Sequence, residues 1–325
     1  MFRFPLTRRA VAFAAPAPGA RADAWRAVAM LAALSACLVS LPGPALSQEM
    51  EPRSYSASPV GTNFIVAGYG RSSGDVVFDA AAPISDAEAD MNLATVAYSK
   101  VFDLGGHQSS VLVALPHIWG EASGEVGEAE RSISRSGFGD IRLKVSTMLI
   151  GGPALPPAAF RARKPRPIVG VSLLAIAPTG EYMSDKLINI GSNRWAFKPE
   201  VGVSYPMGPW QADAYAGVWL YGENDDFLGV RQERKPMGVF QAHLSYTFRP
   251  GLWAALNTTY YVGGQTIVGG RVEANRQENA RIGATVSVPL TQRQSLLFSY
   301  SQGALTRFGG DFTSLAVSWR ALWFD

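Results

Sequence analysis

The sequence predicts an all-β fold, an antiparallel transmembrane β-barrel of about 12 strands that follows an N-terminal signal peptide. Three observations predict it: side chains alternate between apolar and polar, the alternating segments are long, and short connections alternate with long ones. With 325 residues, 47% hydrophobic and 17% charged, the chain can bury a core and is neither disordered nor a coiled coil.

The first 47 residues have the three parts of a secretory signal. Five arginines precede the apolar run 27–41, and the small-residue site Ala45-Leu46-Ser47 follows it. We therefore expect a signal peptide at 1–47, a periplasmic N-terminal segment at 48–60 and the barrel at 61–325. A membrane-spanning anchor is the alternative, but a span needs about 20 apolar residues and Pro42 and Pro44 interrupt this run.

The only cysteine, Cys37, lies inside this predicted signal peptide. Cleavage after Ser47 would leave no disulfide, no zinc-thiolate site and no cysteine nucleophile in the mature chain. Leu34-Ser35-Ala36-Cys37 also matches a lipoprotein cleavage site, which would make Cys37 an acylated N-terminus. The apolar run continues to Leu41, where a lipoprotein would have a polar tether, so the signal peptide is favoured.

The charge balance excludes nucleic acid as a partner. Without residues 1–47 the chain has 24 basic and 25 acidic residues, so it lacks the excess of positive charge that phosphate binding requires. After residue 50 no apolar run approaches the roughly 18 residues of a spanning helix. If the mature protein crosses a membrane, it does so with strands.

The alternation is clearest in residues 281–290. Ile282, Ala284 and Val286 occupy one face of this segment, whereas Thr285 and Ser287 occupy the other, as in a strand with unlike sides. The same pattern predicts strands at 61–70, 91–102, 108–119, 137–149, 167–178, 194–205, 210–221, 236–248, 251–263, 277–289, 294–303 and 311–323. Most exceed the usual five or six residues of soluble sheets and match the roughly nine to eleven of membrane strands.

The connections between these strands alternate in length. The long ones are 71–90, 120–136, 179–193, 222–235 and 264–276, and the short ones are 103–107, 206–209, 249–250 and 290–293. Short periplasmic turns opposite long external loops are typical of outer-membrane barrels. The connection 150–166 departs from this rule, and we expect a solvated turn with a short helical piece there. An even number of strands places both termini on the periplasmic side.

Aromatic residues gather at the predicted strand ends, as two interfacial girdles would require. They are Trp119, Trp195, Tyr205, Trp210, Trp219, Tyr221, Phe248, Trp253, Tyr260, Tyr261, Trp319, Trp323 and Phe324. A soluble sandwich or barrel with an aromatic core is the alternative. It would leave the signal peptide, the long strands and the loop asymmetry unexplained.

Six blocks of sequence carry a family resemblance. They are PRSYS (52–56), PVGTNF (59–64), SSGDVVFD (72–79), SGFGDIR (136–142), APTGEY (177–182) and INIGSNRW (188–195). With them, residues 52–325 resemble the outer-membrane proteins grouped as "MetA-pathway of phenol degradation". The resemblance implies a Gram-negative outer-membrane barrel that transports aromatic or hydrophobic compounds, and it carries over no catalytic residue. The C-terminal strand also resembles the signal read by the barrel-assembly machinery, although Asp325 displaces the usual final aromatic.

Candidates for chemistry are few. The three histidines, His107, His117 and His243, belong to no recognisable unit of nucleophile, base and orienting acid, so we predict no catalytic residue, no cofactor and no enzyme. Acidic loop groups, Asp86, Glu88 and Asp90 together with Glu223, Asp225 and Asp226, could hold Ca²⁺ or Mg²⁺ through carboxylate oxygens. Hydration of outer loops explains them better, and no metal site is predicted.

The polar strand faces carry the functional prediction. If the apolar faces meet lipid, parity places eight polar residues in the lumen: Arg142, Lys144, Lys198, Glu200, Asp213, Gln241, His243 and Arg281. The predicted function is a porin-like passive channel or uptake protein for small, hydrophobic or aromatic solutes. Its expected partners are the solute, outer-membrane lipid and lipopolysaccharide, and the barrel-assembly machinery. The alternatives are an outer-membrane enzyme of the lipid-hydrolase type and a structural or adhesion barrel, and both an open pore and a plugged lumen stay possible.

Overall fold

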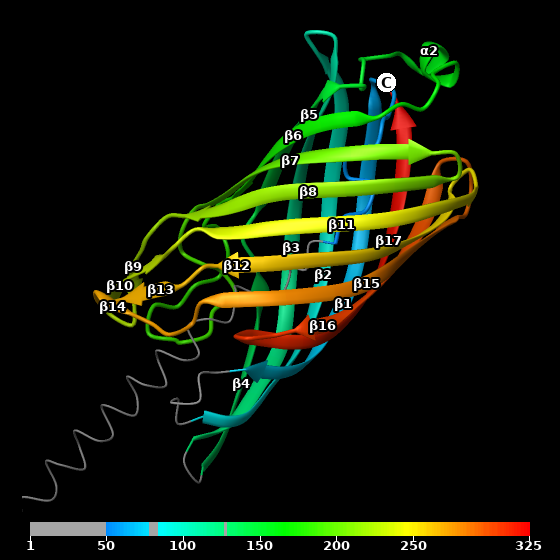
Figure 1. The fold of residues 1–325 in the computed structure, drawn as a ribbon. Coiled ribbons are helices and arrows are strands. Elements are labelled where there is room, and N and C mark those ends of the chain that lie inside the picture. Colours follow the sequence, from blue (N-terminus) through cyan, green and yellow to red (C-terminus); the bar gives the residue numbers. More distant parts are fainter. Residues whose placement is uncertain (1–49, 78–83, 127–128) are drawn as a thin grey trace, which may run out of the picture.

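The structure, a computed structural model, describes residues 50–77, 84–126 and 129–325, and these form a closed antiparallel barrel of twelve strand positions (Figure 1). Pairing of the first wall strand with the last closes the ring. The predicted signal peptide, residues 1–47, lies outside the described residues, as do 78–83 and 127–128. In the described part of the chain no helix is long and apolar enough to cross a membrane.

The wall strands follow the order of the chain, with two consecutive strands sharing the fourth position. They are β1 (Thr62–Val77), β2 (Ile84–Leu104), β3 (His107–Val126), β4 (Ala129–Phe138) with β5 (Arg142–Ile150), β6 (Ile168–Ile176), β7 (Ala196–Met207), β8 (Trp210–Tyr221), β11 (Met237–Arg249), β12 (Leu252–Gly263), β15 (Gln277–Pro289), β16 (Gln294–Leu305) and β17 (Gly309–Phe324).

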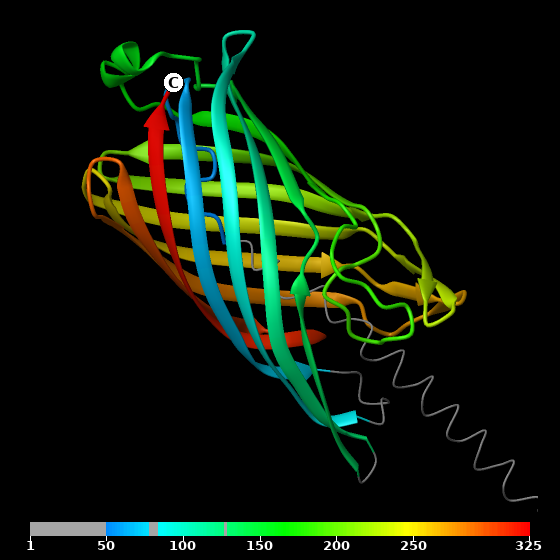
Figure 2. The same cartoon turned by 180° about the vertical axis from the view of Figure 1, so that it is seen from behind.

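Each of the twelve segments predicted as strands overlaps a wall strand, so the predicted fold class is confirmed. Two of the predicted loops are wrong, because 71–90 and 120–136 are largely strand. There β1 to β4 continue past the rest of the wall and diverge from it (Figure 2). These extensions are rich in glycine, polar and small residues, and the small apolar cluster that they bury, with Val76, Ala87 and Ala89 against Phe312, gives only a weak periodic signal. Their backbones still pair on both sides, as Ser73 does with Thr313 and Asp90.

The strand predicted at 137–149 is interrupted after Phe138. Asp140, which is buried, accepts hydrogen bonds from the backbone nitrogens of Gly180 and Ser192, both at 2.9 Å. The segment 177–195 also meets this break, where the backbone nitrogens of Ala177 and Glu181 donate to the carbonyl oxygens of Ile141 and Phe138 at 3.0 and 2.9 Å. Three of the blocks noted above, 136–142, 177–182 and 188–195, meet at this junction.

Two further predicted loops contain short strands. The loops 222–235 and 264–276 form a four-stranded sheet from β9 (Asn224–Phe227), β10 (Val230–Arg234), β13 (Thr266–Val268) and β14 (Arg271–Val272). This pairing joins loops more than thirty residues apart, for example Gln232 with Val268, so local periodicity did not reveal it. The predicted helical piece in 150–166 is α2 (Pro157–Arg161).

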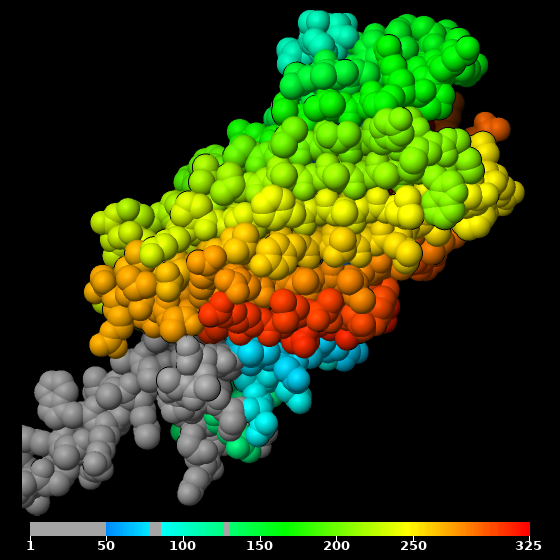
Figure 3. Space-filling model, in the orientation of Figure 1, coloured from blue at the N-terminus to red at the C-terminus, as the bar shows by residue number. Residues whose placement is uncertain are grey.

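The two faces of the wall have opposite polarity. On the outside Leu256 is 68% exposed and Phe240 is 50% exposed, whereas on the inside Ser245 and Thr285 are buried. Figure 3 shows the outer surface of the strands from β6 to β15 packed side by side, in green to orange. A soluble barrel would bury its apolar face instead, so the soluble alternative is excluded and lipid is the solvent of this surface.

Several predicted girdle aromatics do point outward. Trp195, Tyr205 and Phe248 are at least half exposed near strand ends. The prediction is wrong for Trp219, Trp253 and Tyr261, which are buried in the lumen. They stand at inward positions of their strands, because the parity of a residue, and not its distance from a strand end, decides which side it faces.

Replacement of neighbouring residues on β15 tests this parity. Ala284→Arg should lower the folded yield in lipid more than Thr285→Arg, because an arginine on the lipid face at the midplane costs about 2 to 4 kcal/mol. Thr285 lines interior cavities, where the charge can stay hydrated. Heat-modifiable migration in gel electrophoresis measures folded yield, and an equal loss in both variants would contradict the register.

Candidate functional site

All eight residues predicted to line the lumen stand at inward positions. Lys198, Glu200, Asp213, Gln241, His243 and Arg281 are buried, and Arg142 and Lys144 are half-buried. The residues that alternate with them are apolar and exposed, such as Phe197, Val201 and Ile282. Their participation in solute passage stays a prediction.

The lumen is occupied on one side by the chain's own residues 50–61, here called the lumen segment. The backbone nitrogens of Val60 and Gly61 donate to Leu155 and Val101, which ties the segment to the turn end of the barrel. Residues 51–56 then form two successive turns, closed by backbone hydrogen bonds of 3.2 and 3.1 Å. The sequence places 48–60 in the periplasm and did not reveal that residues 50–60 run inside the barrel.

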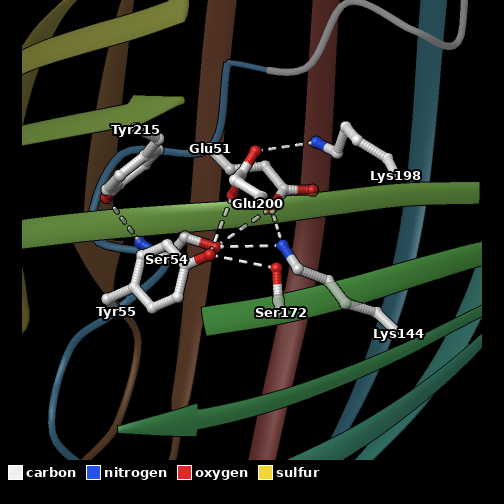
Figure 4. Close-up of polar contacts among 8 residues, drawn as sticks. All are labelled: Glu51, Ser54, Tyr55, Lys144, Ser172, Lys198, Glu200 and Tyr215. Atoms are coloured by element: carbon white, nitrogen blue, oxygen red, sulfur yellow. Dashed lines mark hydrogen bonds and ion pairs between the residues drawn. The ribbon is translucent and has the colours of Figure 1, made fainter. Parts of the chain in front are cut away.

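Tyr55 anchors the lumen segment in the wall (Figure 4). Its hydroxyl donates to Glu200 Oε1 at 3.0 Å and lies 3.0 Å from Ser172 Oγ. Its ring meets that of Tyr215 edge-on, with centroids 5.1 Å apart, and packs against Met148. The side chain is 1% exposed, so it fills its slot completely.

Two inward glycines create the slot for this ring. A Cβ atom on Gly202 would lie 2.1 Å from the Tyr55 ring, and one on Gly170 would lie 2.3 Å from it. Such distances are impossible, so any other residue at either position would displace the ring. Paired glycines at inward positions of β6 and β7 are the sequence signal that could have indicated an inserted aromatic side chain.

Lys198 and Glu200 form a buried ion pair two residues apart on β7. Lys198 Nζ lies 2.9 Å from Glu200 Oε2, and each side chain is 2% exposed. The lysine also lies 5.7 Å from the centre of the Trp219 ring. Because removal of one partner would leave a buried, uncompensated charge, this pair holds the wall in one arrangement.

Arg53 fastens the turn of the lumen segment to the neighbouring strands β8, β11 and β12 of the same wall. Its guanidinium donates to Ser245 Oγ at 2.9 Å and Thr247 Oγ1 at 2.6 Å, and it lies 4.6 Å from the centre of the Trp253 ring. Its backbone nitrogen donates to Asp213 Oδ2 at 3.3 Å. The residue has a φ of 65°, an unfavourable backbone conformation that these contacts offset.

Glu51 and Lys144 form the third attachment. Lys144 Nζ lies 2.6 Å from Glu51 Oε2 and donates to Ser54 Oγ at 3.2 Å. The positive charge of Lys144 stabilises the carboxylate and holds the pKa of Glu51 at about 2, below its ordinary value of 4.5. The Glu51 side chain is 50% exposed in this contact, whereas the Tyr55 side chain is buried.

Closer to the loop end of the barrel, an apolar cluster covers the inner faces of β6, β7, β8, β11 and β12. It consists of Leu174, Ala196, Trp219, Met237, Val239 and Tyr261. On the other side of the lumen segment, β1, β2, β3, β5, β16 and β17 enclose a cavity of about 550 Å³. The lumen is therefore filled along one side and hollow along the other.

The histidines have structural partners. His243 Nδ1 lies 2.9 Å from Asn257 Oδ1, and its ring lies 5.2 Å from that of Tyr215. His117 packs edge-on against Phe138, and His107 Nδ1 lies 3.1 Å from the carbonyl oxygen of Met148. These contacts orient the rings without joining them to a serine and a carboxylate. Among the described residues, no three His, Cys, Asp or Glu side chains are grouped to hold a metal ion.

The wall and the lumen together define the class of protein. A closed barrel of long strands with an apolar outer face and a partly hollow polar lumen is a transmembrane barrel of the outer-membrane channel type. The chain belongs to the family described as "Putative MetA-pathway of phenol degradation", whose model matches residues 69–317. The resemblance noted in the sequence is thereby confirmed. No curated protein matches the chain.

Solved structures support the fold. The COG4313 outer membrane channel from Pseudomonas putida F1 superposes with a TM-score of 0.72 at 23% identity, over 85% of this chain and 100% of that one. The β domain of the Bordetella autotransporter BrkA gives 0.50 at 12% identity, over 81% and 100%. The P. putida toluene transporter TodX gives 0.42 at 9% identity, over 82% and 91%, a likeness too weak to carry an argument.

Loss of the Tyr55 anchor should open the lumen. Tyr55→Ala removes a buried aromatic ring, a change that costs on the order of 3 kcal/mol in packed interiors, and no wall pairing depends on it. We expect a folded barrel with a higher single-channel conductance in planar bilayers. Tyr69→Ala, on the outer face of β1, is the matched control and should leave the conductance unchanged. An unaltered conductance in Tyr55→Ala would show that the lumen segment does not limit passage.

Acid should act on the lumen segment through Glu51. Its lowered pKa means that the pair with Lys144 is fully present above pH 4.5 and is lost as the pH falls through about 2. Conductance should therefore stay at its neutral-pH value through mild acid and rise only near pH 2. Glu51→Gln should start higher and show no acid step. A step near pH 4.5 in the unmodified protein would mean that the pair does not form.

Proposed function

We propose that the protein is a passive channel in the outer membrane of a Gram-negative bacterium, for small molecules with an apolar or aromatic body. The observation that carries this proposal is the cavity of about 550 Å³, which has the size of a small-molecule site. It lies within the lumen, beside the lumen segment, which side-chain contacts and a few backbone hydrogen bonds hold in place without strand pairing.

The wall of this cavity combines apolar and polar side chains, whereas the wall of a water-filled porin is polar. Inward positions of four wall strands hold Phe64, Val66, Leu93, Leu112 and Leu297. These strands are apolar on both faces, since Val113 beside Leu112 is 43% exposed on the outside. An aromatic ring can therefore leave water for this wall with a gain from apolar contact.

Small inward side chains make the space. Ala97 and Ala114 stand opposite each other on β2 and β3, Ser99 follows at the next inward position of β2, and Ser110 stands beyond Leu112 on β3. Larger side chains at these positions would fill the lumen, as they do on the opposite wall. This supports passage of solute along β1, β2 and β3, past the lumen segment.

Other findings support the channel over the alternatives. The family description concerns phenol degradation, and the P. putida relative is described as an outer membrane channel. An enzyme of the lipid-hydrolase type would need a nucleophile and base, and the partners of His243 do not supply them. An adhesion barrel would need no apolar cavity in its lumen.

The outer face and the C-terminus support the proposed partners. The exposed apolar band would meet lipid and, at the loop end, lipopolysaccharide. The last strand, β17, ends at Phe324, which is the aromatic position that the barrel-assembly machinery would read. Asp325 is held aside, because its backbone nitrogen donates to Gly61 and its carboxylate accepts from Asn63 at 2.9 Å.

Solute flux tests the proposal. Proteoliposomes should swell faster in isosmotic phenylalanine than in isosmotic glutamine, because the aromatic ring gains contact with the apolar wall. Leu112→Ser should reduce this preference, whereas Val113→Ser, which faces outward, should not. If the reconstituted protein passes neither amino acid, the channel function is wrong.

A further inference from the structure

Arg320 differs from the other cations of the lumen. It lies at an inward position of β17, half-buried, with its guanidinium 5.8 Å from the centre of the Phe64 ring. Within the described ranges no hydrogen bond or ion pair engages it. By contrast, Arg281 donates to the carbonyl oxygen of Phe312, and Arg53 donates to two hydroxyls.

The cavity that Arg320 lines carries an excess of positive charge. Its described lining includes Arg53, Arg142, Lys144 and Arg320, but Glu51 is its one acidic residue. That carboxylate is already paired with Lys144. Low-dielectric walls concentrate such a potential, so the cavity attracts anions and repels cations.

The strand register places the apolar wall directly beside this guanidinium. Arg320 pairs with Val66 across the β1–β17 ladder, and Val66 in turn pairs with Ala97 on β2. Phe64 lies one inward position further along β1, under the guanidinium. The Arg320 guanidinium is planar and can donate two parallel hydrogen bonds to one carboxylate. The apolar wall beside it can contact an aromatic ring.

We infer that this cavity binds small aromatic carboxylates, with the carboxylate on Arg320 and the ring against the wall formed by Phe64, Val66 and Leu112. This inference rests on the proposed function and names its solute class. A neutral hydrocarbon would leave the guanidinium desolvated without a counter-charge. A small inorganic anion would gain nothing from the apolar wall.

Binding to the purified full-length protein in detergent tests the site without requiring transport. The probes are benzoate, benzyl alcohol as its neutral analogue, and acetate as the headgroup alone, measured by isothermal titration calorimetry. We expect benzoate to bind at least tenfold more tightly than either of the others. Arg320→Gln should abolish this difference, and Arg320→Lys should retain part of it, because an ammonium keeps the charge without the bidentate geometry.

Arg276→Gln, a change at an exposed arginine, is the matched control and should leave benzoate binding unaltered. Heat-modifiable migration confirms that each variant is folded. Equal affinities of benzoate and benzyl alcohol, or unchanged benzoate binding in folded Arg320→Gln, would overturn the inference even if solutes pass the channel. Arginine-dependent benzoate binding in a protein that passes no solute would instead uphold the site and reject the channel.

Discussion

Closure of the wall between β1 and β17 is the constraint on which the rest of the structure depends. The two strands pair over sixteen residues, from Thr62 opposite Phe324 to Val77 opposite Gly309. In hydrocarbon, an unpaired backbone group costs several kcal/mol, so an open sheet edge cannot exist there. Closure also fixes parity around the whole ring, which decides which side chains meet lipid. Finally, it sets the start of β1 at the barrel mouth, where the preceding residues 50–61 turn into the lumen.

The interior then has to satisfy many buried polar groups at once. Lys198 and Glu200 neutralise each other, while Asp213 accepts hydrogen bonds from its own wall and from the lumen segment. The lumen segment occupies space that the wall leaves free for it. Gly170 on β6 and Gly202 on β7 have no side chain, and the Tyr55 ring fills the space beside them. The segment is held by side chains and turns rather than by strand pairing. The hydrogen-bonded wall therefore closes independently of this element.

The asymmetry of the lumen connects this construction to solute passage. Where the inner wall is polar, the lumen segment and an apolar cluster fill the space. Where it is apolar and its side chains are small, the cavity remains. An apolar surface next to unneutralised guanidinium charge is suited to molecules that combine a ring with an anionic group. The same strands are apolar on both faces, so the wall beside lipid and the wall beside solute have the same chemistry.

The sequence by itself determined the barrel, its strand number and the inward positions of the eight polar residues, because alternation and strand length are local properties. Charge, length and the lone Cys37 argued against other classes of protein in the same local way. Only the tertiary structure decided what those inward residues touch. The hydrogen bond from Tyr55 to Glu200, the seat of Tyr55 between Gly170 and Gly202, and the cluster of Trp219 with Leu174 and Tyr261 depend on contacts between distant segments. Such contacts leave no periodic signal, since the energy of packing side chains depends on which strands the closed ring brings face to face.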